Sequence, residues 1–322
     1  MSLKPAEQEW IVDGVLRTNR KRPSVLAGKP ESGKSSLSKQ LAVAVLQGRP
    51  FLGRQTIQAD VLYWCTEDTP EDIQESFKHL GYDPEKDKNL FVFKGDCEQN
   101  TIDALHDALS VSECTGVKLV IIETLDDLLK LKDIKENTAA RQAFDKFNSI
   151  VMKKFCHRVA FLGLHHIKKR ETESSGDGLL GASVIRGRTD GKWYLKTKSD
   201  DDPRRIFHTE VRKGKNIEQT YLDYNPETET STLGVTVTEE RKLSAGRTGE
   251  RIKQSILEYF VAHPNATFEK DCLPVIDGNS DLKRRMFREL AAKDFLVKSG
   301  KGTKTSPFVY RVAEIPVEQV AA

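Results

Sequence analysis

The sequence predicts an α/β protein built around a mostly parallel sheet. Short apolar runs alternate with segments whose apolar residues recur at helical spacing, which places helices on both faces of a parallel sheet. One apolar run leads directly into a glycine-rich loop and then a helix. The apolar runs lie at 24–27, 61–65, 90–93, 117–122, 159–164, 193–196 and 206–212, and the helical patterns at 35–47, 70–80, 101–112 and 137–155.

The order of these segments divides the 322 residues into two domains. Residues 1–224 hold the alternating pattern, and their last runs predict an antiparallel extension of the sheet. Residues 225–247 are polar and rich in Thr, Glu and Gly, which is typical of a linker. Residues 248–313 predict three helices and a hairpin, the order of a small winged helix-turn-helix domain, and 314–322 form a tail.

The composition indicates a protein of the cytoplasm. Hydrophobic residues make up 38% of the chain and charged residues 31%, which together suit a soluble protein with a real core. No apolar run approaches the roughly 20 residues of a membrane span, and the N-terminus lacks a signal-peptide pattern. The five cysteines form no C-x-x-C pair, so we expect reduced thiols and no membrane partner.

Residues 28–35 match the G-x-x-x-x-G-K-[ST] pattern of a phosphate-binding loop. The two glycines let the backbone turn its N–H groups toward phosphates. The lysine reaches the β- and γ-phosphates, and the serine hydroxyl completes a Mg²⁺ shell. We therefore expect ATP and Mg²⁺ as ligands, held by Gly28, Glu31, Ser32, Gly33, Lys34, Ser35 and Ser36.

Hydrolysis also needs a carboxylate that holds the metal and a group that activates water. The sequence offers both at the ends of apolar runs, where parallel sheets build their sites. Glu123 follows the run 117–122 and is the candidate to hold Mg²⁺ with Ser35, although Asp is the usual residue there. Glu67 follows the run 61–65 and is the candidate general base, with Asp68 or Thr69 capping the next helix.

A sensor of the γ-phosphate is expected at the end of the run 159–164, where His165 and His166 lie. Neighbouring residues of a strand face opposite sides of the sheet, so at most one histidine reaches the nucleotide. Asp126 and Asp127, which follow Glu123, are predicted to lie in a solvated helix start.

Several linked motifs resemble the RepA-like hexameric replicative helicases, a group of RecA-type ATPases. The resemblance covers about residues 8–224 and implies a RecA-like P-loop NTPase core. It implies that Lys34 and Ser35 contact phosphate and Mg²⁺, and that His166, rather than His165, is the sensor. It also implies Glu67 as the catalytic glutamate and Glu123 as the Walker B acid. The motifs are Gly28–Ser36, Leu41 with Gly48–Arg54, Tyr63 with Glu67 and Asp68, and Leu164–His166 with Lys169.

The same resemblance implies a homo-oligomeric ring, expected to be a hexamer, with each nucleotide between two subunits. A basic residue of the neighbouring subunit completes the site, and such a finger contributes about 10³–10⁵ in rate in the best-studied enzymes. Lys213 and Lys215 are the first candidates, because their turn is similar to the K-x-K pair of RecA-type proteins. Arg186 and Arg188 are the alternatives.

Two regions carry candidate DNA contacts. Residues 241–322 hold 15 Lys/Arg against 10 Asp/Glu, which indicates a nucleic-acid face in the C-terminal domain. A basic helix face and wing suit duplex DNA, although many winged helices bind protein instead. In RecA-type rings the loop after the sensor faces a channel for single-stranded DNA. The candidates are Lys168, Lys169 and Arg170 in that loop, Lys283, Arg284 and Arg288 on the solvent side of the third C-terminal helix, and Lys301 and Lys304 in the wing.

These observations predict an ATP-hydrolysing, oligomeric DNA motor. Its most economical form is a replicative-type DNA helicase of a plasmid, phage or integrated element, with replication proteins among its partners. One alternative is an ATP-switched DNA-binding regulator or helicase loader that does not unwind. Another is a winged-helix DNA-binding protein with a non-hydrolysing nucleotide site, which Glu123 leaves open.

Overall fold

The computed structural model describes residues 9–65, 68–87, 89–94, 101–131, 137–167, 187–199, 201–263 and 269–313. The chain forms two compact units, Met1–Val237 and Thr238–Ala322. Each unit has a hydrophobic core of its own. Among the helices so described, none combines the length and the apolar character that a membrane crossing requires.

The first unit is built on a nine-stranded sheet in the spatial order β11-β10-β9-β8-β3-β7-β6-β4-β5. The strands from β8 to β5 in that order run parallel. The strands β9, β10 and β11 extend the sheet in antiparallel fashion. This large, mostly parallel sheet fits a RecA-like core. Its strands are β3 Ser24–Gly28, β4 Asp60–Cys65, β5 Leu90–Lys94, β6 Val117–Glu123, β7 Ala160–His166, β8 Gly191–Thr197, β9 Arg205–Val211, β10 Thr220–Asn225 and β11 Thr230–Thr236, preceded by the hairpin β1 Trp10–Val12 and β2 Leu16–Arg17.

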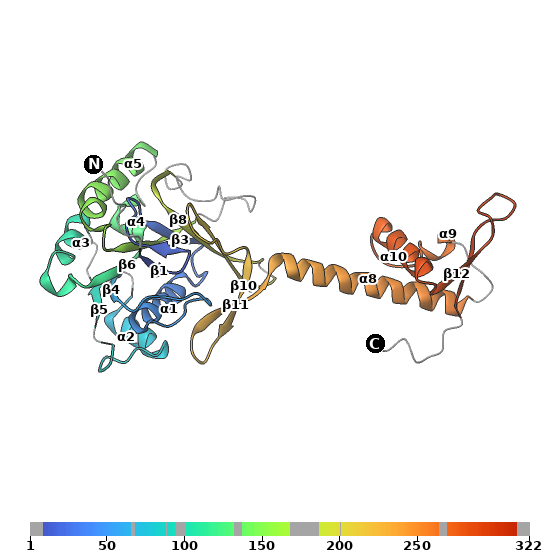
Figure 1. Ribbon diagram of the computed structural model, residues 1–322, viewed down its shortest axis with the longest axis horizontal. Helices are drawn as coiled ribbons and strands as arrows, with labels where there is room; N and C mark the ends of the chain where they lie inside the picture. The colour runs from blue at the N-terminus through green and yellow to red at the C-terminus, as the bar shows by residue number, and fades with distance from the viewer. Residues whose placement is uncertain are drawn as a thin grey trace, which may run out of the picture. The chain divides into compact units, whose positions relative to one another are not determined.

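Helices cover both faces of this sheet (Figure 1). On one face lie α1 Lys34–Gln47 and α2 Pro70–His79. The other face carries α3 Ile102–Ala108, α4 Leu125–Leu128 and α5 Asn137–Phe147. A 3-10 turn η1, Ser112–Cys114, follows α3, and a π-helical turn η3, Asn148–Met152, joins α5 to α6 Lys153–Phe155.

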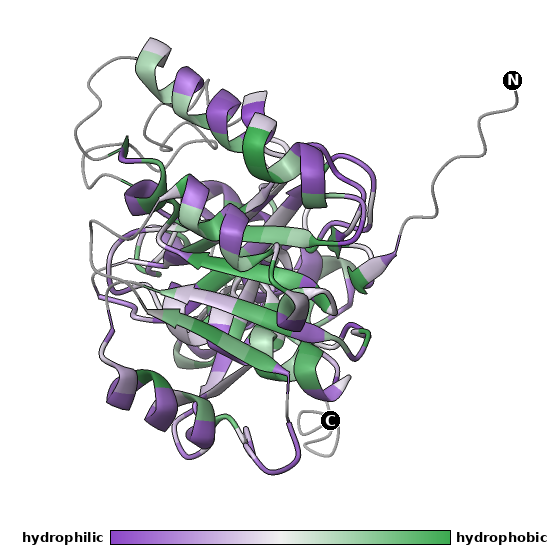
Figure 2. Cartoon of the chain, turned by 90° about the vertical axis from the view of Figure 1, so that its left-hand side faces the viewer, coloured by the Kyte–Doolittle hydropathy of each residue, from purple (hydrophilic) through white to green (hydrophobic). Residues whose placement is uncertain are grey.

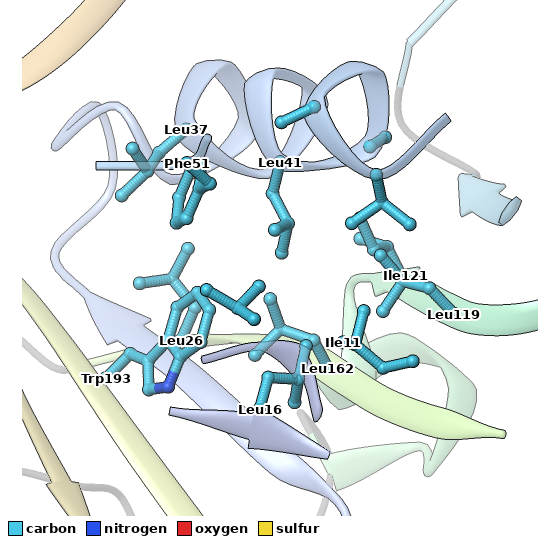
Figure 3. Packing of buried hydrophobic residues seen from close by; sticks show 14 of the residues in the cluster. Ile11, Leu16, Leu26, Leu37, Leu41, Phe51, Leu119, Ile121, Leu162 and Trp193 are labelled. Atoms are coloured by element: carbon cyan, nitrogen blue, oxygen red, sulfur yellow. The ribbon is translucent and has the colours of Figure 1, made fainter. Parts of the chain in front are cut away.

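The central strands supply side chains to both cores, because successive residues of a strand point to opposite faces. In β3, Leu26 joins the core under α1, whereas Val25 and Ala27 join the core under α4 and α5. Figure 3 shows Leu37 and Leu41 of α1 directed toward the strand side chains. The interior strands are correspondingly apolar (Figure 2).

The prediction that residues 225–247 form a linker is wrong. Residues 230–236 form the edge strand β11, and residues 237–262 form the helix α8, Val237–Ala262. The side-chain amide of Gln40 both donates to the Ser231 carbonyl oxygen and accepts from the Ser231 N–H, each at 2.9 Å. An edge strand with one solvated face tolerates the polar composition that suggested a linker, and its Thr and Val residues favour extended backbone.

The second unit contains most of α8, then α9 Glu269–Cys272, α10 Ser280–Ala292 and the antiparallel hairpin β12 Leu296–Ser299 and β13 Val309–Val312. Asn279 caps α10, since its side-chain oxygen accepts from the N–H groups of Asp281 and Leu282. Ile256, Phe260 and Phe287 are completely or almost completely buried in the core between α8 and α10. This core lets the second unit be stabilised by its own apolar contacts.

Candidate functional site

The phosphate loop connects β3 to α1. Gly33 precedes the helix with φ 90°, and Glu31 also has a positive φ of 62°. A Cβ at Gly28 would lie 2.4 Å from the carbonyl oxygen of Leu195, so only glycine fits between the loop and β8. Within the part of the chain that the structure describes, the hydroxyl of Ser32 is buried and has no hydrogen-bond partner, as expected for a loop whose ligand is an anion.

Lys34 lies at the first position of α1 and is 4% exposed. Its ammonium donates to the carbonyl oxygens of Gly28, at 3.1 Å, and Lys29, at 2.8 Å. These bonds hold the charge across the loop, beside the N-terminus of α1. The ammonium and the helix dipole both favour an anion at this position.

Glu123 ends β6 beside this loop and is 2% exposed. One of its carboxylate oxygens accepts from the hydroxyl of Ser35, and the other accepts from the hydroxyl of Tyr63. Burial, followed by the charge of Glu123, raises the pKa of Tyr63 well above its ordinary value, so the phenol remains a donor. The structure thus brings together Ser35 and Glu123, the pair expected to hold Mg²⁺.

A second carboxylate belongs to the same cluster. Ligand atoms of Asp68, Glu123 and Cys65 all lie within 4.8 Å of one another. Hard cations such as Mg²⁺ prefer oxygen ligands, so the two carboxylates and the Ser35 hydroxyl fit this metal and the thiol does not. The oxygen donors present are therefore suitable for Mg²⁺.

Asp68 is held toward this cluster by Lys39 of α1. The ammonium of Lys39 lies 2.7 Å from the Asp68 carboxylate, and Lys39 is 5% exposed. Thr69, rather than Asp68, caps α2, because its hydroxyl accepts from the N–H of Asp72 at 3.2 Å. Glu67, the predicted general base, lies outside the described residues, next to this anchored acid.

The two histidines at the end of β7 have different environments. His166 pairs in register with Gly28 and shares the strand face of Leu164, which packs in the core under α1. His165 is 2% exposed and faces the opposite side, where its Nδ1 lies 2.5 Å from a carboxylate oxygen of Asp126. His166 is therefore the histidine on the phosphate-loop side.

Asp126 is not solvated, contrary to the prediction for this helix start. It is 6% exposed, and its second carboxylate oxygen accepts from the backbone N–H of His166 at 2.9 Å. Asp127 does lie at the cap, where its carboxylate accepts from the hydroxyl of Thr124. Asp126 consequently ties α4, which follows Glu123, to the end of β7.

A family model described as an AAA domain matches residues 1–172, more than half of the chain. The chain belongs to the AAA domain family. The matched stretch includes the phosphate loop, Glu123 and both histidines. The family supports P-loop NTPase character and ATPase activity, and it is consistent with ATP and Mg²⁺ as ligands. No curated protein matches the chain.

The candidate finger residues of this AAA-domain protein lie away from its own phosphate loop. Lys213 and Lys215 are exposed in the turn after β9. Since β9 is antiparallel to β8, that turn lies at the end of the sheet opposite the loop. Lys215 pairs with Asp13 at 3.1 Å, and Arg188 pairs with Asp145 of α5. Arg186 lies outside the described residues.

Only some of the candidate DNA-contacting residues lie in the part of the chain that the structure describes. Lys168, Lys169 and Arg170 lie outside the described residues. Lys283, predicted on the solvent side of α10, is 9% exposed, and its ammonium donates to the carbonyl oxygen of Ile276 at 2.7 Å. That prediction is wrong, because the lysine stem folds back over the second unit's core. The exposed candidates are Arg284 and Arg288 on α10 and Lys301 and Lys304 between β12 and β13.

Sequence reasoning missed three side chains that organise the site. Tyr63 was named only as part of a family motif, Asp126 was predicted to lie in a solvated helix start, and Lys39 was assigned no role. Each makes its deciding contact with a residue at least 29 positions away in the chain. The one local signal for such a residue was a polar side chain at a position that the apolar periodicity predicts to be buried.

Proposed function

We propose that this AAA-domain protein is an oligomeric, DNA-dependent ATPase that works as a replicative-type helicase of a plasmid, phage or integrated element. The observation that carries the proposal is the bond from Ser35 to Glu123 beside the ammonium of Lys34. It joins a carboxylate suited to metal binding to a phosphate-binding loop, which are two of the parts that phosphoryl transfer to water requires.

Each residue has a stated role in the proposed hydrolysis. Lys34 neutralises charge on the β- and γ-phosphates, and Ser35 and Glu123 hold Mg²⁺, with Asp68 as a further oxygen donor. Held there, Mg²⁺ would supply positive charge that offsets the negative charge of the phosphates. Glu67 orients and deprotonates the attacking water, and His166 reports loss of the γ-phosphate to the residues after β7.

A ring of subunits supplies the remaining charge in this proposal. Lys213 and Lys215 are exposed at the end of the sheet away from their own phosphate loop, so they suit a neighbour's site better than their own. Arg188 is the weaker candidate, because its side chain is 28% exposed beside Asp145, whereas that of Lys215, although paired with Asp13, is 73% exposed.

DNA is proposed as the substrate of the motor. Arg284 and Arg288 project from the exposed side of α10, and Lys301 and Lys304 are exposed in the following hairpin loop. A helix in the major groove with a basic wing on the backbone is the docking mode of a winged helix-turn-helix. We therefore propose duplex binding by the second unit and single-strand binding by the loop after His166.

A strand-displacement assay, run in parallel with an ATPase assay stimulated by single-stranded DNA, tests the proposal. Wild-type protein should hydrolyse ATP faster with DNA and should displace a labelled strand. Lys34→Ala and Glu67→Gln should lose both activities. Glu71→Gln is the matched control, since it removes an exposed carboxylate four residues from Glu67 and should retain both.

The competing function has support from the site itself, because Ser35 and Tyr63 occupy both oxygens of Glu123. If ATP drives assembly and DNA binding while strand displacement is absent, the protein is an ATP-switched regulator or loader. If ATP binds but no DNA elicits turnover, the site is non-hydrolysing. Either result would overturn the helicase proposal.

A further inference from the structure

Arg205, the first residue of β9, lies against the phosphate loop. A Cβ placed on Gly33 would be 2.6 Å from Nη1 of Arg205 and 2.8 Å from its Cζ. The position follows from the sheet, because Arg205 pairs with Thr197 at the end of β8 and β8 flanks β3. The antiparallel extension therefore returns a guanidinium to the N-terminus of α1.

This placement is unfavourable without a ligand. The N-terminus of α1 already carries the positive end of the helix dipole and the ammonium of Lys34, and its first turn has no acidic residue. In the part of the chain that the structure describes, Arg205 contacts the ring of Tyr224, with 5.8 Å from Cζ to the ring centroid, and no carboxylate bonds to it. An anion between the guanidinium and the loop would relieve this repulsion.

The neighbouring arginine shows a different arrangement. Arg204 bonds to both carboxylate oxygens of Asp202, and its guanidinium covers the ring of Tyr221 at 4.4 Å. Its charge is thus neutralised in the turn that precedes β9. Arg204 offers a matched control, because it has the same chemistry one residue away.

The sheet order indicates which part of a nucleotide Arg205 would contact. Glu123 and His166 lie on β6 and β7, on one side of β3, whereas β8 and β9 lie on the other side. The residues proposed to bind the metal and to sense the γ-phosphate therefore lie on the first side of β3. A guanidinium from the second side approaches the phosphates that remain after hydrolysis, and its planar fork suits their paired oxygens.

We propose that Arg205 is a phosphate-binding residue of the nucleotide site, supplied by the same chain and contacting the diphosphate portion of ATP and ADP alike. The inference rests on the proposed function, since it assumes that the phosphate loop binds a nucleotide. It separates Arg205 from the finger of a neighbouring subunit, which acts on the γ-phosphate during hydrolysis. Arg205 therefore acts on the affinity for both nucleotides.

Titration of the full chain with ADP and with a non-hydrolysable ATP analogue tests this proposal. Arg205→Ala should raise both Kd values about tenfold, as expected for loss of a charge-assisted hydrogen bond. Arg205→Lys should give an intermediate Kd, and Arg204→Ala should bind as wild type does.

Thermal unfolding distinguishes binding from a structural role. Ligand-free Arg205→Ala should melt no lower than wild type, because like-charge repulsion is removed, while its Tm should rise less on addition of ADP. An unchanged Kd for ADP, or a raised Kd together with a lower Tm of the ligand-free variant, would overturn the assignment of Arg205. Failure of wild-type protein to bind either nucleotide would instead overturn the proposed function.

Discussion

Glu123 connects three parts of the site through one carboxylate. It ends β6, accepts from Ser35 at the start of α1 and accepts from Tyr63 on β4. Its extra methylene relative to Asp is accommodated because Tyr63 fixes the second oxygen. The longer acid is therefore compatible with a metal-binding role at this strand end.

Replacing Glu123 tests that role. Glu123→Gln keeps the size but removes the charge, so kcat should fall by at least about 100-fold, as for loss of a major electrostatic group. Glu123→Asp should retain more activity and should need more Mg²⁺, because its carboxylate reaches less far. Phosphate release measured across a Mg²⁺ titration checks both variants, with the exposed Glu113→Gln as control. Activity of Glu123→Gln within about twofold of wild type would contradict the assignment.

Variants of the two adjacent histidines should affect different properties, with His165 determining stability and His166 determining ATP turnover. His165→Ala leaves the buried carboxylate of Asp126 without its ring partner, so urea unfolding should show a loss of about 2 kcal/mol. His166→Ala should unfold close to wild type but hydrolyse ATP more slowly, because it removes the proposed sensor of the γ-phosphate. The opposite pattern, with stability lost only in His166→Ala and turnover only in His165→Ala, would exchange the two roles.

The helix α10 shows how an element can carry two kinds of basic residue. Lys283 is turned inward to the Ile276 carbonyl, whereas Arg284 and Arg288 remain exposed. Helical spacing alone does not separate them, because a long lysine stem can cover apolar surface and end at a carbonyl. The contact between Lys283 and the Ile276 carbonyl depends on the segment between α9 and α10, which brings that carbonyl to the first turn of α10.

The double variant Arg284→Ala/Arg288→Ala should bind duplex DNA about tenfold more weakly and with a smaller salt dependence, since phosphate contacts release counterions. Lys283→Met should keep the salt dependence and lose about 1 kcal/mol of stability through the unpaired Ile276 carbonyl. Fluorescence anisotropy at two salt concentrations and urea unfolding measure these effects. Equal DNA affinity of the double variant and wild type would remove α10 from the interface.

Whether a strand or loop could be predicted from the sequence depends on which interactions stabilise it. The seven apolar runs coincide with β3 to β9, because strands buried on both faces carry a continuous apolar signal. The edge strand β11 was not predicted, since its stability comes from pairing with β10 and from Gln40 of α1 rather than from apolar residues of its own. The loop was predictable from its motif, but Arg205 was not, because strand pairing brings it to Gly33.

At the scale of the whole molecule, the chain combines an AAA domain with a smaller basic unit. The first unit contains the phosphate loop, the oxygen atoms proposed to bind Mg²⁺ and the two histidines. The second contains the exposed cations of α10 and the following hairpin. In the proposed motor, ATP hydrolysis in the first unit acts on DNA that both units bind.

ATP turnover in the presence of Mg²⁺, with and without single-stranded DNA, tests the central claim most directly. The measurement compares wild-type protein with Lys34→Ala, whose ammonium bridges the phosphate loop. The account predicts turnover that DNA stimulates in wild type and that is lost in Lys34→Ala. Absence of turnover in wild type under every DNA condition, or equal turnover in both proteins, would contradict it.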